Sequence, residues 1–112
     1  MKIKLKQVLV EMDNITPIIV QGVDLTLKTI IGNSLLTPLM DKKDPSGAIL
    51  VLGDNDKQKK EKYDLFTEKI RDCPAEEIDL EAKEIALIEK AIWDVQPTLI
   101  AGQSFAILEG KV

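Results

Sequence analysis

The sequence contains no histidine and a single cysteine, Cys73, and these two shortages exclude whole classes of chemistry. Without histidine, a serine or cysteine nucleophile lacks its usual general base. A lone cysteine forms no disulfide within the chain and supplies one ligand where a zinc site needs about four. We therefore expect a protein that is not an enzyme, carries no cofactor or metal, and folds in the reducing cytosol.

Long hydrophobic runs and aromatic residues are also scarce. The longest uninterrupted apolar run has five residues, whereas a membrane-spanning helix needs about 20. The chain starts with alternating apolar and lysine residues and not with the apolar stretch of a signal peptide. Hydrophobic residues still make up 45% of the 112 residues, and aromatics only 4%, so the core must consist of Ile, Leu, Val and Ala. We expect a single domain, residues 1–112, with no membrane contact.

Arginine is scarce as well, and the acidic residues outnumber the basic ones, 19 to 15. The net charge is -4, the pI is about 4.8, and Arg71 is the single arginine. Nucleic-acid binding requires several cationic contacts to phosphates, so this balance disfavours it. A basic run remains as a weak candidate for phosphate contact, although four lysines without interleaved aromatics are also typical of a solvated helix face. The lysines of this run are Lys57, Lys59, Lys60 and Lys62.

Alternation at the start of the chain indicates β-structure. Ile3 and Leu5 alternate with lysines, and a second β-rich run follows at residues 18–22. Asp13 and Asn14 are good turn formers between the two runs. The pattern predicts an N-terminal β-hairpin, which needs the helices or another chain to be stable.

The remainder of the chain shows helical spacing. The first helix is predicted to begin at Asp24 or Thr26 and to stop before Pro38. A second helix starts near Lys57 and ends by Pro74, and Asp79 is the predicted cap of a third. Cys73 lies on the apolar stripe of the second helix, beside Ile70, and is interpreted as a small buried hydrophobe and not a reactive thiol. With a fourth helix over 97–110, the prediction is an α+β fold of a β-hairpin packed on about four helices.

One segment, "PSGAILVLGDNDKQ" at residues 45–58, fits no ligand motif. It lacks the glycine and glutamate of a calcium loop and the Gly-Lys-Ser/Thr ending of a phosphate loop. Its acidic end is interpreted as a helix cap, supplied by Asp54, Asn55 or Asp56. Residues 48–52 predict a third short strand. We expect this strand to pair with the N-terminal hairpin and complete a small sheet; the alternative is an exposed arm that docks on a second subunit.

An uneven charge distribution suggests a protein partner. Between Glu76 and Asp94 there are seven acidic residues and two lysines, whereas the N-terminal segment and the lysine run are basic. Trp93, the single tryptophan, either covers the core or anchors an interface. The candidate partner-binding residues are Ile49, Val51, Leu52, Trp93, Glu81 and Glu84.

Four stretches carry a resemblance to a known group: "LTLKTIIGNSLLTPL", "KKEKYDLFTEKI", "EEIDLEAKEIALIEKAI" and "PTLIAGQSFAILEG". Together they resemble small proteins of unknown function encoded by tailed bacteriophages and prophages. The resemblance covers roughly residues 1–40 and 57–110. It implies a bacterial host cytoplasm, or association with the virion, and it brings no catalytic signature. In that group the first two helices are joined by a shorter link, so residues 45–55 are an elaboration.

Three functions follow from these patterns. The first is a non-enzymatic accessory protein that binds a host or phage protein. The second is a head or tail component, or an assembly factor, that self-associates as an oligomer. The third is a weak nucleic-acid-binding accessory protein that uses the lysine run.

Overall fold

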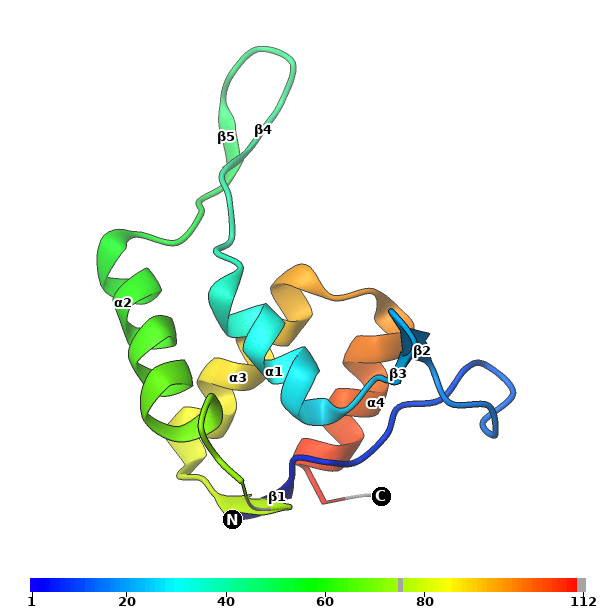
Figure 1. The fold of residues 1–112 in the computed structure, drawn as a ribbon. Helices are drawn as coiled ribbons and strands as arrows, with labels where there is room; N and C mark the ends of the chain where they lie inside the picture. Colours follow the sequence, from blue (N-terminus) through cyan, green and yellow to red (C-terminus); the bar gives the residue numbers. More distant parts are fainter. Residues whose placement is uncertain (75, 111–112) are drawn as a thin grey trace.

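The structure, a computed structural model, describes residues 1–74 and 76–110 and has an α+β fold (Figure 1). The helices are α1 (Leu27–Leu36), α2 (Asp56–Leu65), α3 (Ala82–Val95) and α4 (Thr98–Leu108), and a π-helical turn, η1 (Phe66–Ile70), continues α2. Helix α1 packs against α3 on one side and against α2 and η1 on another, and α4 packs against α3. In the described residues, no helix combines the length and apolarity that crossing a membrane requires.

The helix ends follow local capping chemistry in most cases. Thr26 caps α1 by accepting a hydrogen bond from the Thr29 amide, and the C-cap of the helix is Thr37, directly before Pro38. Asn55 caps α2 in a capping box with Gln58. The predicted cap of the third helix is wrong, because Asp79 lies in a strand and the N-cap of α3 is Glu81.

The short strands form antiparallel pairs. Strand β1 (Lys2–Lys4) pairs with β6 (Glu77–Asp79), and β2 (Ile19–Val20) pairs with β3 (Val23–Asp24). The predicted N-terminal hairpin is present in an irregular form, since the Ile18 amide donates to Leu9 O and a bridge joins Val10 to Pro17. Its first strand, however, leaves the hairpin to pair with β6.

One hydrophobic core lies between the helices and the N-terminal segment. Ile3, Leu5 and Leu9 are fully buried, which confirms the predicted half-buried alternation. Gln103 of α4 holds the same segment, accepting from Val10 N at 2.9 Å and donating to Val10 O at 2.7 Å. The buried aliphatic residues of the helices are Leu27, Ile30, Ile31, Leu35, Leu65, Ile70, Ile85, Ile88, Ile92, Ile107 and Leu108.

Close contact between α1 and η1 depends on a glycine. A Cβ at Gly32 would lie 3.1 Å from Cε1 of Phe66, so any larger residue would require the ring to move by a few tenths of an ångström. The apolar spacing of the helices predicts burial of Leu36 and Tyr63, and this is wrong, since both are about half exposed. Next to the tyrosine, Lys62 takes the buried position.

Candidate protein-binding surface

The most prominent surface feature is a β-ribbon, which we call the arm (residues 40–53). It consists of β4 (Lys42–Lys43) and β5 (Ile49–Val51), paired antiparallel, and it projects from the helices where α1 ends and α2 begins (Figure 1). The predicted strand at residues 48–52 is therefore confirmed. Its predicted pairing with the N-terminal hairpin is wrong, because β5 pairs with β4, which lies only a few residues earlier and is the nearest available edge.

The arm carries consecutive exposed aliphatic residues. Ile49, Leu50, Val51 and Leu52 are 52%, 67%, 41% and 74% exposed. Since side chains alternate between the two faces of a strand, exposure of all four means that neither face of β5 is covered. Isolated two-stranded ribbons are marginally stable in water, and their outer edges offer unpaired backbone groups to another chain.

The tip of the arm is organised around Asp44, whose backbone also bonds to Ala48 and Gly47. Oδ1 of Asp44 accepts hydrogen bonds from the Ser46 amide, the Ser46 hydroxyl and the Ala48 amide, at 2.6–3.0 Å. The hydrogen bond from the Ser46 hydroxyl holds the pKa of Asp44 below its ordinary value, so the carboxylate stays charged. Gly47, with φ at 89°, supplies the left-handed turn conformation. The tip therefore has a defined shape.

The base of the arm is clasped as well. The Gly53 amide donates to Asp41 Oδ1 at 2.6 Å. The Asp54 amide donates to the Leu39 carbonyl oxygen at 2.7 Å, and the Leu39 amide donates to Asp54 Oδ2 at 2.9 Å. A Cβ at Gly53 would lie 2.5 Å from the Leu39 carbonyl oxygen. The two segments that lead into and out of the arm thus lie so close together that they leave the helices in one direction.

A buried ion pair anchors this base to α2. Lys62 Nζ lies 2.5 Å from Asp54 Oδ2, and both side chains are only 2% exposed. Burial acts to raise the pKa of Asp54, but the hydrogen bonds from Lys62 and the Leu39 amide and the positive charge of Lys62 outweigh it, so the pKa lies below its ordinary value. The pair is therefore a structural element of the arm's base, and Lys62 is not available to bind a phosphate.

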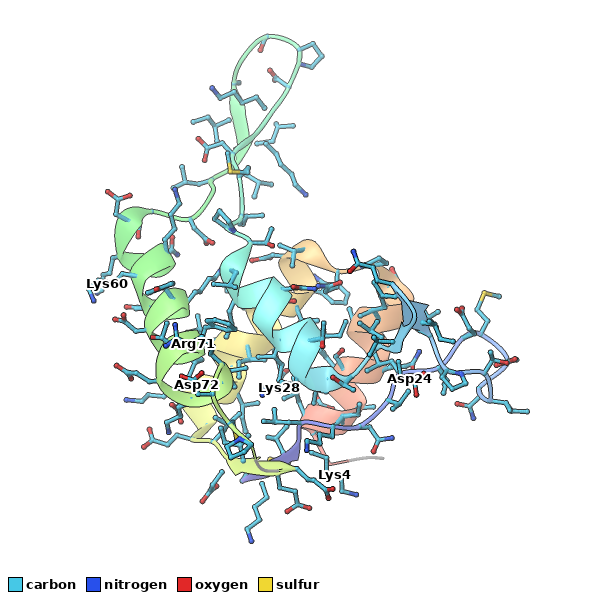
Figure 2. All side chains as sticks on the ribbon, in the orientation of Figure 1. Lys4, Asp24, Lys28, Lys60, Arg71 and Asp72 are labelled. Carbon is cyan, nitrogen blue, oxygen red and sulfur yellow. The ribbon has the colours of Figure 1, made fainter. Side chains whose placement is uncertain are left out.

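The other members of the lysine run remain on the surface. Lys57, Lys59 and Lys60 are exposed, and Figure 2 shows Lys60 on the outer side of α2. Lys60 contacts Asp64 at 2.9 Å, one helical turn away. The run therefore offers three surface lysines, one of them already paired with an acid.

A groove with a volume of about 560 Å³ lies between α2, η1 and α3. Its apolar lining consists of Leu65, which is buried, and Leu87, which is half-buried. We call it the acidic groove, because its polar lining contains one lysine, Lys83, and four acids. The acids are Glu61, Asp64, Glu68 and Glu84.

Glu81 and Glu84, two of the predicted partner-binding residues, serve the start of α3. The Glu81 amide donates to Glu84 Oε1 at 2.9 Å, and Lys69 contacts the same oxygen at 3.0 Å. Burial acts to raise the pKa of Glu84, but these two hydrogen bonds outweigh it and lower the pKa. Glu84 also lines the acidic groove, whereas Glu81 is not among the lining residues.

Trp93 lies apart from these features, on α3. Its side chain is 66% exposed, so it does not close the core. Its ring centroid is 5.9 Å from that of Phe105 on α4, at an interplanar angle of 40°. Beside it, burial and the nearby charge of Glu109 raise the pKa of Glu89. Of the predicted partner-binding residues, the structure thus brings together Ile49, Val51 and Leu52 on the arm and leaves Trp93 on another face.

Comparisons with known proteins add no relative. No protein-family model, no curated protein and no solved structure matches this chain. Over residues 1–74 and 76–110, no group of three His, Cys, Asp or Glu side chains is placed to hold a metal ion. The surface therefore has to be interpreted from its own chemistry.

Proposed function

We propose that this chain is a small non-enzymatic accessory protein of the phage type, which acts in the bacterial host cytoplasm through protein–protein contact made by the arm. The observation that carries the proposal is the run of four exposed aliphatic residues, Ile49 to Leu52, on a ribbon held clear of the helices. Burying one such side chain contributes about 1.5–3 kcal/mol. A partner that covers the arm gains this free energy several times over.

The form of the arm favours a particular mode of contact. A ribbon with open edges joins a partner by adding a strand to its sheet or by laying its aliphatic face on an apolar groove. Both modes need a ribbon whose direction is fixed before binding, because ordering a loose segment reduces affinity. The hydrogen bonds of Asp44 at the tip and the clasp of Asp41 and Gly53 at the base supply that order.

Site-specific photo-crosslinking tests the proposal in bacterial cells that contain the chain. A photo-reactive amino acid placed at Leu50 should crosslink to protein, whereas one placed at Val23 should not. Val23 is the matched control, because it is exposed to the same degree (67%) and also lies in a short strand. Equal crosslinking at the two positions would contradict the proposed role of the arm.

A second candidate function is self-association, as in a structural or assembly component of a phage particle. The acidic groove favours it, because the arm carries two lysines, Lys42 and Lys43, and the groove carries the opposite charge. Weak nucleic-acid binding has no comparable support, since Lys62 is buried and Lys60 is paired with Asp64.

A further inference from the structure

We propose that the arm of one copy of this chain docks in the acidic groove of a second copy. The inference rests on the proposed function, because the arm is the contact element in both, and it names the partner as the chain itself. It is argued from the charge and apolar surface of the arm, from those of the groove, and from the direction in which the arm is held.

The arm is amphipathic across its two strands. Lys42 of β4 lies opposite Val51 of β5, and Lys43 lies opposite Ile49. All four of these side chains are exposed. The arm therefore presents an aliphatic strand bordered by two cations.

The two acids of the arm do not cancel this pattern in space. Asp41 lies at the base, where it accepts from the Gly53 amide, and Asp44 lies at the tip, where it accepts from Ser46 and Ala48. Both carboxylates thus bond to backbone amides at the ends of the ribbon. The lysines remain along the middle, beside the aliphatic residues.

The acidic groove has the complementary arrangement. Leu65 and Leu87 give it an apolar floor, and Glu61 and Glu68 lie one turn before and almost one turn after Leu65 on the same face of the helix. Neither Glu61 nor Glu68 forms an ion pair among the described residues. An apolar strand on the leucines would bring its flanking lysines to these glutamates.

The fold itself does not account for the row of acids. Glu61, Asp64 and Glu68 are spaced three and four residues apart, so they are neighbours along α2 and η1 and repel one another. Lys60 forms an ion pair with Asp64, and the contact with Asp64, together with the nearby charge of Glu68, raises the pKa of Lys60. This one lysine offsets the repulsion only in part. A cationic partner in the groove relieves the repulsion that an isolated chain retains.

The arm does not reach the groove of its own chain. It points away from the helices at the start of α2 (Figure 1), and the clasp of Asp41, Gly53 and Asp54 holds it in that direction. The groove is lined by residues 61–68, farther along α2 and η1. The contact is therefore between two copies.

A nearer apolar pocket fits the arm less well. The pocket has a volume of about 260 Å³ and lies between α1 and α2, where Leu36, Pro38 and Tyr63 line it. Lys59 also lines it, with Lys57 on the same exposed helix start, so docking there would place the arm's lysines next to like charges. Charge thus selects the acidic groove. Each copy has one arm and one groove, and the assembly that we infer is the closed one, a two-fold dimer in which both arms are docked.

Analytical ultracentrifugation of charge-reversed variants tests the inference. The arm variant Lys42→Glu/Lys43→Glu and the groove variant Glu61→Lys/Glu68→Lys should each associate at least about a hundredfold more weakly than wild type, because like charges then face each other. An equimolar mixture of the two variants should recover the dimer, since each arm then meets a groove of opposite charge. A single chain carrying all four changes should also recover it. The recovery separates a lost contact from a failure to fold.

A matched control and the contrary results complete the test. Lys4→Glu/Lys6→Glu reverses the charge of two exposed lysines outside the arm, which is the same change in net charge as in the arm variant. It should leave the dimer unchanged. A monomeric wild type at the highest concentration reached, or a mixture that fails to pair, overturns the inference. If position 50 then still crosslinks to a different protein, the proposed function stands alone. If position 50 crosslinks to nothing, both proposals fail.

Discussion

At the scale of single residues, the pair of Lys62 and Asp54 is the buried ionic contact at the base of the arm. Both side chains are almost fully buried, and the carboxylate also accepts from the Leu39 amide. Removing one member of such a pair leaves an uncompensated buried charge, which costs far more than the intact pair contributes. The intact pair therefore adds little net stability, but an arrangement of the arm's base that separates the two charges is strongly disfavoured.

Lys62→Met should lower the free energy of unfolding by about 3–5 kcal/mol, because the Asp54 carboxylate is then buried without its cation. The double variant Asp54→Asn/Lys62→Met should be clearly more stable than Lys62→Met, since no charge remains to be buried. Denaturant titration of the four members of this double-mutant cycle measures both effects. Two additive single costs would show that the side chains are not coupled.

The lowered pKa of Asp54 gives the pair a pH dependence. A carboxylate whose pKa is lower in the folded state adds stability that is present above the unfolded value, 3.8, and is lost as pH falls through the folded value. At pH values below about 4, the unfolding free energy should therefore decrease. Asp54→Asn should flatten this acid limb. Thermal melts of both proteins between pH 7 and 2 provide the measurement, and parallel curves would contradict the assignment.

Two helical glycines should respond to alanine with opposite signs. Gly102→Ala adds a methyl group that meets nothing within 4 Å, so it should stabilise α4 by about 0.5–1 kcal/mol. Gly32→Ala gains the same propensity but forces a methyl group to 3.1 Å from the Phe66 ring, and overpacking of this kind costs about 1–3 kcal/mol. Urea unfolding of the two variants measures the difference. A stabilised Gly32→Ala protein would show that the Phe66 ring moves aside at little cost.

At the scale of elements, the arm is separable from the helical part of the chain. Its aliphatic residues are exposed, and none of them belongs to the buried core. Replacing residues 42–52 with a short Gly-Ser turn, while Leu39, Asp41, Gly53 and Asp54 are kept, should therefore change the unfolding free energy by no more than about 1 kcal/mol. Far-ultraviolet circular dichroism and a denaturant titration make the comparison. An unfolded product would mean that the arm is needed for folding.

Elements with local signals were predictable from the sequence. Thr26, Pro38 and Asn55 act within a few residues of their own positions, and the structure confirms α1 and α2 at those boundaries. The pairing of β1 with β6 joins residues more than seventy positions apart, and no local pattern contains that register. Asp79 was assigned to a helix cap for the same reason: its place in β6 depends on β1, at the other end of the sequence.

The candidate site was predictable to a similar extent. The aliphatic run at Ile49 to Leu52 is visible as composition, and the structure adds that it is exposed on both faces. Burial of Lys62 was missed because the residue was counted with its basic neighbours. Its spacing from Leu65 and Phe66, three and four residues on, was the available signal. The acidic groove needs α3 beside α2, which a sequence pattern on one helix does not provide.

At the scale of the whole molecule, the arm makes the chain less compact than its length requires. The radius of gyration is 14.9 Å, and the principal extents are 44 × 32 × 26 Å. A compact chain of this length has a radius of gyration of about 13 Å. The excess agrees with a ribbon that extends clear of the helices (Figure 1).

Small-angle X-ray scattering should detect this extension in solution. The replacement of residues 42–52 by a short turn should lower the radius of gyration from near 14.9 Å towards about 13 Å. Data extrapolated to zero concentration, in buffer of high ionic strength, keep self-association out of the comparison, because salt screens contacts between exposed charges. The charge variant Lys42→Glu/Lys43→Glu is the control, since it keeps the arm and should keep the larger radius. Equal radii for the wild type and the arm-replaced chain would mean that the arm lies folded against the helices, and the docking geometry proposed for it would then be lost.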